Sequence, residues 1–299
     1  MENLQSDSSS PLSFGEHFAN INGIVIHYYV GGDGPVLLFP SPGWGPSVNY
    51  VIPMNCLEKH CTVVYFDARH SGKSTGPENP EGYKLENFVA DIEALRIYLN
   101  QSKIFIAGHS GGGHQVLAYA IEYNDRLLGI ISIDAIVAAD SVRAEEMMRR
   151  ITKKKNEPFY IANTGYHDRA TELMLNSNKA SLSLKEVISI MGAFYFYKPE
   201  LAATVFENME YNDEVFGYTQ ASGFQGKNLL PELYKITVPT LIIVGEDDFI
   251  CDPLSQGLRM NERIKSSHLE IIIESGHMPW IEQPELFNST CEAWFNINF

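Results

Sequence analysis

Ser110 lies in the strongest chemical signal of the chain, a Gly-x-Ser-x-Gly sequence at residues 108–112. An apolar run at 104–107 precedes this sequence, and residues 115–123 have the composition of a helix. A serine between a strand and a helix occupies a strained turn, where glycine neighbours let the two elements approach closely. The pattern therefore predicts that Ser110 is a nucleophile.

A serine hydroxyl at its ordinary pKa is a weak nucleophile, so this prediction requires a general base and a group that orients the base. His277 follows the apolar run at 269–273, and Asp247 and Asp248 follow the apolar run at 239–244. The order serine, aspartate, histidine is one in which such triads occur along a chain. The chemistry of the residues leaves the choice between the two aspartates open.

Acyl transfer also requires two N–H donors for the developing oxyanion, one from the residue after the nucleophile and one from an earlier loop. Gly111 supplies the first donor. The earlier loop is Phe39-Pro40-Ser41-Pro42-Gly43-Trp44-Gly45. Because proline has no N–H, Ser41 is the central residue of this loop that can supply the second donor.

Strands and helices alternate on both sides of these residues. We expect strands at 24–30, 36–39, 62–66, 103–107, 128–133, 239–244 and 269–273, and helices at 85–99, 115–123 and about 284–295. Such an alternation is typical of an α/β protein with a mostly parallel sheet covered by helices on both faces.

The alternation is interrupted between residues 138 and 230, where the sequence is helical and rich in aromatic residues. An insertion between two strands of one sheet indicates a cap over that sheet. The sequence therefore predicts a flexible tail at 1–13, a core formed by 14–137 and 231–299, and a helical cap at 138–230.

The charge of the chain excludes several partners. There are 22 Lys and Arg residues against 37 Asp and Glu residues, which gives a net charge of -15. Such a charge repels nucleic acid and anionic membranes. The basic segment at 149–155 is interpreted as a solvated face of this acidic protein, with docking of an anionic substrate as the alternative.

The N-terminal residues and the cysteines indicate the compartment. The chain begins with polar residues that do not form a signal peptide, and no segment has the length of a membrane span. The four cysteines, Cys56, Cys61, Cys251 and Cys291, lack the Cys-x-x-Cys spacing of a disulfide framework or zinc site. We expect reduced thiols in a cytoplasmic protein.

Three motifs together resemble the prolyl aminopeptidases (proline iminopeptidases), which belong to the α/β-hydrolases. They are Pro42-Gly43-Trp44-Gly45 followed by Tyr50, the segment 65–74, and Gly108-His109-Ser110-Gly111-Gly112. The family typically shows H-G-G-P-G-G-G, D-Q-R-G-x-G-x-S and G-G-S-W-G-S at these places. This chain departs from all three, with Phe39-Pro40-Ser41 for His-Gly-Gly, His70 for a glycine, and glycines after Ser110 where the family has tryptophan.

The resemblance implies an α/β-hydrolase fold and helps to choose the acid. In this family the acid usually stands three residues after the glycine that ends its strand, which is Gly245 here. The resemblance thus implies Asp248 rather than Asp247. Asp134 is a third candidate, because some relatives place the acid after the strand that follows the nucleophile.

The resemblance also implies a serine hydrolase that needs no cofactor and acts on a small molecule or short peptide. Prolyl aminopeptidases hold the free amine of the substrate with carboxylates of the cap. The cap here offers Glu145, Glu146, Glu157, Glu172, Glu186, Glu200, Glu207 and Glu210, but no motif singles one out. An esterase or lactonase for small acyl compounds is the alternative, and a ligand-binding homologue without turnover is the alternative of another class.

Aromatic residues are the candidates for the substrate pocket: Trp44 in the loop, and Phe159, Tyr195 and Tyr197 in the cap. The cap residues either line this pocket or form the cap's own core.

Two further patterns have structural interpretations. Residues 71–75 imitate the end of a phosphate-binding loop, but the position of its first glycine is occupied by Asp67. We expect Asp67 and Arg69 to anchor loops near the site instead. His109 and His114 lack metal-ligand spacing, so we expect packing and hydrogen bonding for both and no metal site.

Overall fold

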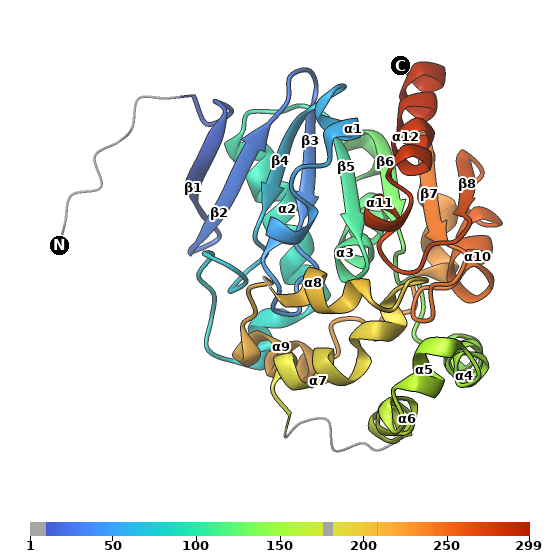
Figure 1. Cartoon of the computed structure of the whole chain (residues 1–299). Coiled ribbons are helices and arrows are strands. Elements are labelled where there is room, and N and C mark those ends of the chain that lie inside the picture. The colour runs from blue at the N-terminus through green and yellow to red at the C-terminus, as the bar shows by residue number, and fades with distance from the viewer. Residues whose placement is uncertain (1–9, 176–181, 208) are drawn as a thin grey trace.

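The computed structural model describes residues 10–175, 182–207 and 209–299, and it is built on one eight-stranded sheet (Figure 1). The strands lie in the order β1-β2-β4-β3-β5-β6-β7-β8. Their bounds are β1 (Gly15–Ile21), β2 (Ile24–Gly31), β3 (Val36–Pro40), β4 (Thr62–Phe66), β5 (Ile104–His109), β6 (Leu127–Ile133), β7 (Thr240–Gly245) and β8 (Ser267–Ile272). β2 is antiparallel to β1 and β4, and the other pairs are parallel.

The central strands are buried on both faces, because helices cover each side of the sheet. In β5, Ile104 and Ile106 belong to the hydrophobic cluster under α2 (Leu85–Tyr98) and α3 (Gly111–Glu122). Phe105 and Ala107 belong to the cluster under α1 (Asn55–Glu58) and α12 (Pro284–Asn298). Successive side chains of a strand point to opposite faces. A continuous apolar run therefore predicts a strand that is buried on both faces of the sheet. The mostly parallel α/β fold is confirmed.

The other helices differ in where they lie. The short helices α10 (Leu258–Asn261) and α11 (Pro279–Glu282) belong to the core, on either side of β8 in the chain. Between β6 and β7, the described residues form helices that are called the cap helices below: α4 (Ser141–Lys154), α5 (Pro158–Ala162), α6 (Tyr166–Leu175), α7 (Leu184–Met191), α8 (Leu201–Glu207) and α9 (Asp213–Ser222). Figure 1 shows these helices gathered at the end of the sheet where the parallel strands finish.

Asp67 anchors a loop, as predicted from the sequence, whereas the ion pair of Arg69 is with a helix. The buried Asp67 carboxylate accepts hydrogen bonds from the Ser47 hydroxyl at 3.0 Å and from the backbone N–H of Val48 at 2.7 Å, and it pairs with the His27 ring at 2.8 Å. The buried Arg69 guanidinium forms an ion pair with Asp91 at 2.8 Å. Asp67 thereby holds the loop that contains Ser47 and Val48, and Arg69 holds helix α2 (Leu85–Tyr98).

Two further predictions concern the whole chain. All four cysteines are buried and free, as expected for reduced thiols. None of the helices in the described part of the chain combines the length and apolarity that a membrane crossing requires.

Candidate active site

Ser110 occupies a strained turn between β5 and α3, with φ 55° and ψ -119°. A positive φ is unfavourable for a residue with a β-carbon and persists only where the surrounding structure imposes it. Glycine is required at position 108, two residues before Ser110, because a β-carbon there would lie 2.6 Å from the Gly112 carbonyl oxygen. This is the backbone arrangement that the Gly-x-Ser-x-Gly sequence predicts.

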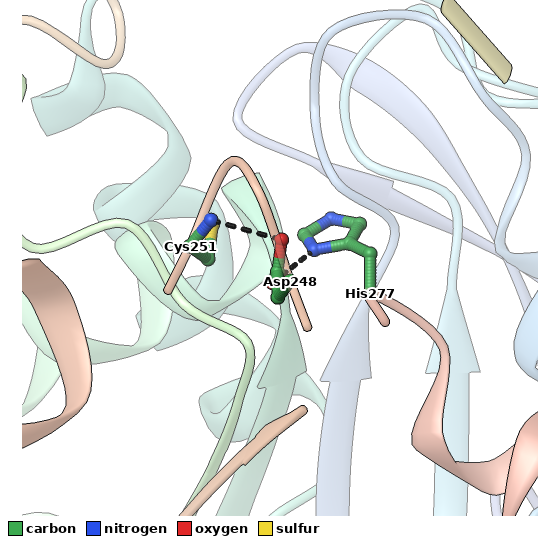
Figure 2. Close-up of side chains that lie close together, drawn as sticks. All are labelled: Asp248, Cys251 and His277. Atoms are coloured by element: carbon green, nitrogen blue, oxygen red, sulfur yellow. Dashed lines mark hydrogen bonds and ion pairs between the residues drawn. The ribbon is translucent and has the colours of Figure 1, made fainter. Parts of the chain in front are cut away.

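His277 and Asp248 form a buried hydrogen-bonded pair, with 2.7 Å between His277 Nδ1 and Asp248 Oδ2 (Figure 2). The other oxygen of Asp248 accepts the backbone N–H groups of Ile250 at 2.8 Å and Cys251 at 3.1 Å. Burial opposes ionisation of Asp248, but the His277 ring and these N–H donors outweigh it and lower the pKa to about 2. Because Nδ1 faces a carboxylate, Nε2 is the nitrogen left to act as a base.

The segments that carry Ser110 and His277 contact each other through His109. Among the described residues, no hydrogen bond joins the side chains of Ser110 and His277. The rings of His277 and His109, the residue before Ser110, have centroids 4.5 Å apart. His109 Nε2 donates to the His277 carbonyl oxygen at 2.8 Å, and the Tyr50 hydroxyl donates to His109 Nδ1 at 2.8 Å. Burial, and then the nearby His277, hold the pKa of His109 well below its usual value. A neutral His109 therefore fixes the backbone of His277, which fits the hydrogen-bonding role predicted for it.

The neighbouring aspartates have other partners. Asp247 forms an ion pair with Lys154 of the cap helix α4. Asp134 accepts the backbone N–H of Gly245 at 2.8 Å, and its second oxygen is buried without a partner among the described residues. Burial, and then the Asp248 carboxylate, raise the pKa of Asp134 well above its usual value, which keeps it neutral beside an ionised Asp248. The structure thus brings Asp248, and not Asp247, to His277.

The pair between Lys154 and Asp247 joins the cap to the core, and Lys154 is only 1% exposed. We expect Lys154→Met to lower the free energy of unfolding by about 3 kcal/mol, because the substitution leaves the Asp247 carboxylate without its partner. Urea unfolding measures this change. Lys153→Met, at an exposed neighbouring position, is the control, and equal effects of the two substitutions would contradict the prediction.

The prediction that Ser41 donates to the oxyanion is wrong. The Ser41 N–H already donates to the Phe66 carbonyl oxygen at 2.8 Å. Pro40 pairs with Phe66 in the parallel ladder of β3 and β4, so Ser41 supplies the next donor of that ladder. The Ser41 hydroxyl is also engaged, since it accepts the N–H of Ala68 at 2.9 Å.

Gly111 keeps a free donor. It is the first residue of α3, and the first N–H groups of a helix have no partner within the helix. No described residue accepts a hydrogen bond from the Gly111 N–H. The side chain of Gln225 is close by, with Nε2 lying 2.5 Å from where a β-carbon on Gly111 would be.

A cavity of about 260 Å³ opens beside Ser110, between the core and the cap. Trp44 and Tyr195 line it, as predicted, but Phe159 and Tyr197 do not. Phe159 packs against Tyr160 and Tyr166 in the cap, and Tyr197 is 42% exposed. These two aromatic residues therefore belong to the cap itself and to its surface.

The rest of the cavity wall is mostly apolar. The apolar residues are Ile136, Met147, Leu173, Met174, Leu184, Val187, Ile188, Met191, Phe216, Phe249 and Ile250. The polar groups that sequence reasoning missed are Arg143, Gln220 and Gln225. None of the described carboxylates lines this cavity, so none of the eight cap glutamates reaches it.

Asp248, Cys251 and His277 each offer an atom that could coordinate a metal ion, and these atoms lie within 4.8 Å of one another (Figure 2). Hydrogen bonds already use His277 Nδ1 and both oxygens of Asp248. Burial raises the pKa of the Cys251 thiol well above its usual value, whereas a metal ligand must be a thiolate. These residues fit an Asp–His pair better than a metal site.

Comparison with known proteins agrees with this geometry. Residues 35–284 match the family described as the alpha/beta hydrolase fold, and the chain belongs to this family. It is 27% identical over 286 residues to a proline iminopeptidase of Saccharolobus solfataricus, a match that covers 91% of this chain and 89% of the relative.

Solved structures of hydrolases share the fold. An esterase of Exiguobacterium antarcticum superposes with a TM-score of 0.71 at 20% identity, covering 95% of this chain and 100% of the esterase. The enol-lactonase of Burkholderia xenovorans LB400 superposes with a TM-score of 0.67 at 22% identity, covering 94% of this chain and 100% of the lactonase. The protein is therefore an α/β-hydrolase that resembles the prolyl aminopeptidases, as the sequence motifs predict.

Proposed function

We propose that the protein is a serine hydrolase that cleaves esters or lactones through an acyl-enzyme. The observation that carries this choice is the charge of the cavity beside Ser110. Its described wall contains the guanidinium of Arg143 and no carboxylate. A cationic, carboxylate-free cavity disfavours the protonated amine that an aminopeptidase must bind. The iminopeptidase relative supports the aminopeptidase alternative, which the experiment below tests.

In the proposed reaction Ser110 Oγ attacks the carbonyl carbon while His277 Nε2 accepts the hydroxyl proton. Asp248 orients the ring through Nδ1 and stabilises its positive charge. His277 then returns the proton to the leaving alcohol, and water attacks the acyl-enzyme by the same route. This proposal requires a hydrogen bond between Ser110 Oγ and His277 Nε2 in the complex with substrate, and catalytic hydrogen bonds often tighten only in that complex.

Gly111 N–H is the first oxyanion donor in this proposal, and the Gln225 amide is the second. The proximity of Gln225 Nε2 to Gly111 supports this assignment, as does its place on the wall of the cavity. A side-chain amide can replace a backbone N–H in this role.

Gln225→Leu should lower kcat by about 10²-fold, because one oxyanion donor is worth roughly 10²–10³ in kcat. KM should change much less, since the donor acts on charge that develops in the transition state. Steady-state hydrolysis of 4-nitrophenyl butyrate gives both parameters. Gln220→Leu removes an amide from the same cavity and is the control; equal losses of kcat in both variants would refute the role of Gln225.

The choice of substrate is tested with the 4-nitrophenyl esters of cyclopentanecarboxylic acid and of proline. The two esters share the leaving group and the ring size and differ in the ring amine. An ester hydrolase with a cationic cavity should give the higher kcat/KM with the carbocyclic ester. A preference for the proline ester, together with turnover of proline 4-nitroanilide, would establish the aminopeptidase instead.

A further inference from the structure

Arg143 differs from the other buried or partly buried arginines because it forms no ion pair with a described carboxylate. Every other arginine with a buried or partly buried side chain forms an ion pair with a carboxylate, namely Arg69, Arg96, Arg150, Arg259 and Arg263. Arg143 is also partly buried, yet no described carboxylate lies within ion-pair distance of it. Partial burial of a guanidinium without a counter-charge costs free energy that an anionic ligand would offset.

The guanidinium is held in place and still has free donors. Arg143 lies in the first turn of α4, where its backbone N–H donates to Asp140 Oδ1 at 3.2 Å. Its Nε donates to the carbonyl oxygen of Ile250 at 2.8 Å, on the loop that carries Asp248. The two terminal nitrogens donate to no described residue, and the side chain lines the cavity that contains Ser110.

We propose that Arg143 binds a carboxylate of the substrate, so that the natural substrate is an apolar ester or lactone that carries a carboxylate. This inference rests on the proposed hydrolysis at Ser110 and names the substrate class of that site. The two terminal N–H groups of an arginine match the two oxygens of a carboxylate. The remaining wall is apolar, apart from Gln220, Gln225 and Tyr195, and suits a hydrocarbon body between the carboxylate and the scissile carbonyl.

A carboxylate fits better than a phosphate. The cavity offers one positive charge within a protein of net charge -15, and a dianionic phosphate would be only half neutralised there. No described lysine or second arginine lines the cavity. A substrate with a single negative charge therefore matches the site.

The competing role for Arg143 is structural, because its bond to Ile250 links the cap to the loop that carries Asp248. A purely structural role would affect all substrates alike. The test must therefore compare substrates that differ only in the carboxylate.

The 4-nitrophenyl ester of pentanoic acid and the 4-nitrophenyl monoester of glutaric acid meet this need. Their acyl chains have the same length, and one ends in a methyl group where the other ends in a carboxylate. The wild-type protein should prefer the glutarate monoester in kcat/KM by about tenfold to a hundredfold, the value of a hydrogen bond to a charged group. Arg143→Gln should abolish this preference, and the ratio of the two kcat/KM values measures it.

Arg149→Gln is the matched control, since it removes the same charge from an exposed position of the same helix. It should keep the wild-type ratio. A wild-type protein without the preference, or an Arg143→Gln variant that loses activity equally on both esters, would overturn the inference and leave the proposed function standing. Failure of the wild-type protein to hydrolyse either ester would overturn both.

Discussion

Replacing Ser110 with alanine should abolish hydrolysis of 4-nitrophenyl butyrate and covalent labelling by a fluorophosphonate. Ser110 Oγ is the atom that we propose bonds to the carbonyl carbon, and no other described serine sits at a strand-to-helix turn with a positive φ. Loss of a serine nucleophile costs about 10⁶-fold in kcat, while the oxyanion donors and the cavity sustain a small residual rate. Mass spectrometry of the labelled protein should place the adduct on the peptide that contains Ser110.

Ser189→Ala is the control for this experiment, because Ser189 is an exposed cap serine outside the cavity. This variant should be labelled and should hydrolyse the ester like the wild type. A wild-type protein that neither reacts with the fluorophosphonate nor hydrolyses any ester would indicate the ligand-binding homologue. A nucleophile that needs a strained backbone has no purpose in such a homologue.

The secondary structure was well predicted wherever apolar periodicity is strong. The helix expected at 85–99 is Leu85–Tyr98, and the strand expected at 24–30 is Ile24–Gly31. The helix expected from 115 begins at Gly111, because three consecutive glycines read as a loop although the close approach of β5 and α3 requires small residues there. β1 was missed, since an edge strand that alternates between exposed and buried residues carries a weak apolar signal.

The site was predictable where residues follow strands, and less so elsewhere. Ser110, Asp248 and His277 each follow a strand, so a parallel sheet gathers them at one edge. Ser41 was misjudged because counting the donors of a loop does not reveal that the ladder of β3 and β4 extends into it. Arg143 and Gln225 carry no local signal, since the packing of the cap on the core, and not their spacing, brings them to the cavity.

Replacing Asp248 with asparagine should lower kcat by about 10⁴-fold, because the amide favours the wrong tautomer of the histidine. The pKa of Asp248 is lowered to about 2, so the carboxylate is ionised at any ordinary assay pH. A folded-state pKa below the unfolded value of about 3.9 stabilises the fold above that value, and this contribution is lost as the pH falls toward 2. The wild type should therefore lose stability over this range more steeply than Asp248→Asn in pH-dependent urea unfolding.

Asp247→Asn is the matched control for the acid, since it makes the same change one residue earlier. Asp247 pairs with Lys154 rather than with His277, so this variant should mainly lose stability and should keep a kcat far above that of Asp248→Asn. Asp134→Asn tests the third candidate, whose neutral carboxyl lies beside Asp248. Asp134 accepts a hydrogen bond from the N–H of Gly245, and the amide oxygen of asparagine can accept the same hydrogen bond. A kcat that falls more in Asp247→Asn or Asp134→Asn than in Asp248→Asn would show that another carboxylate orients His277 during turnover.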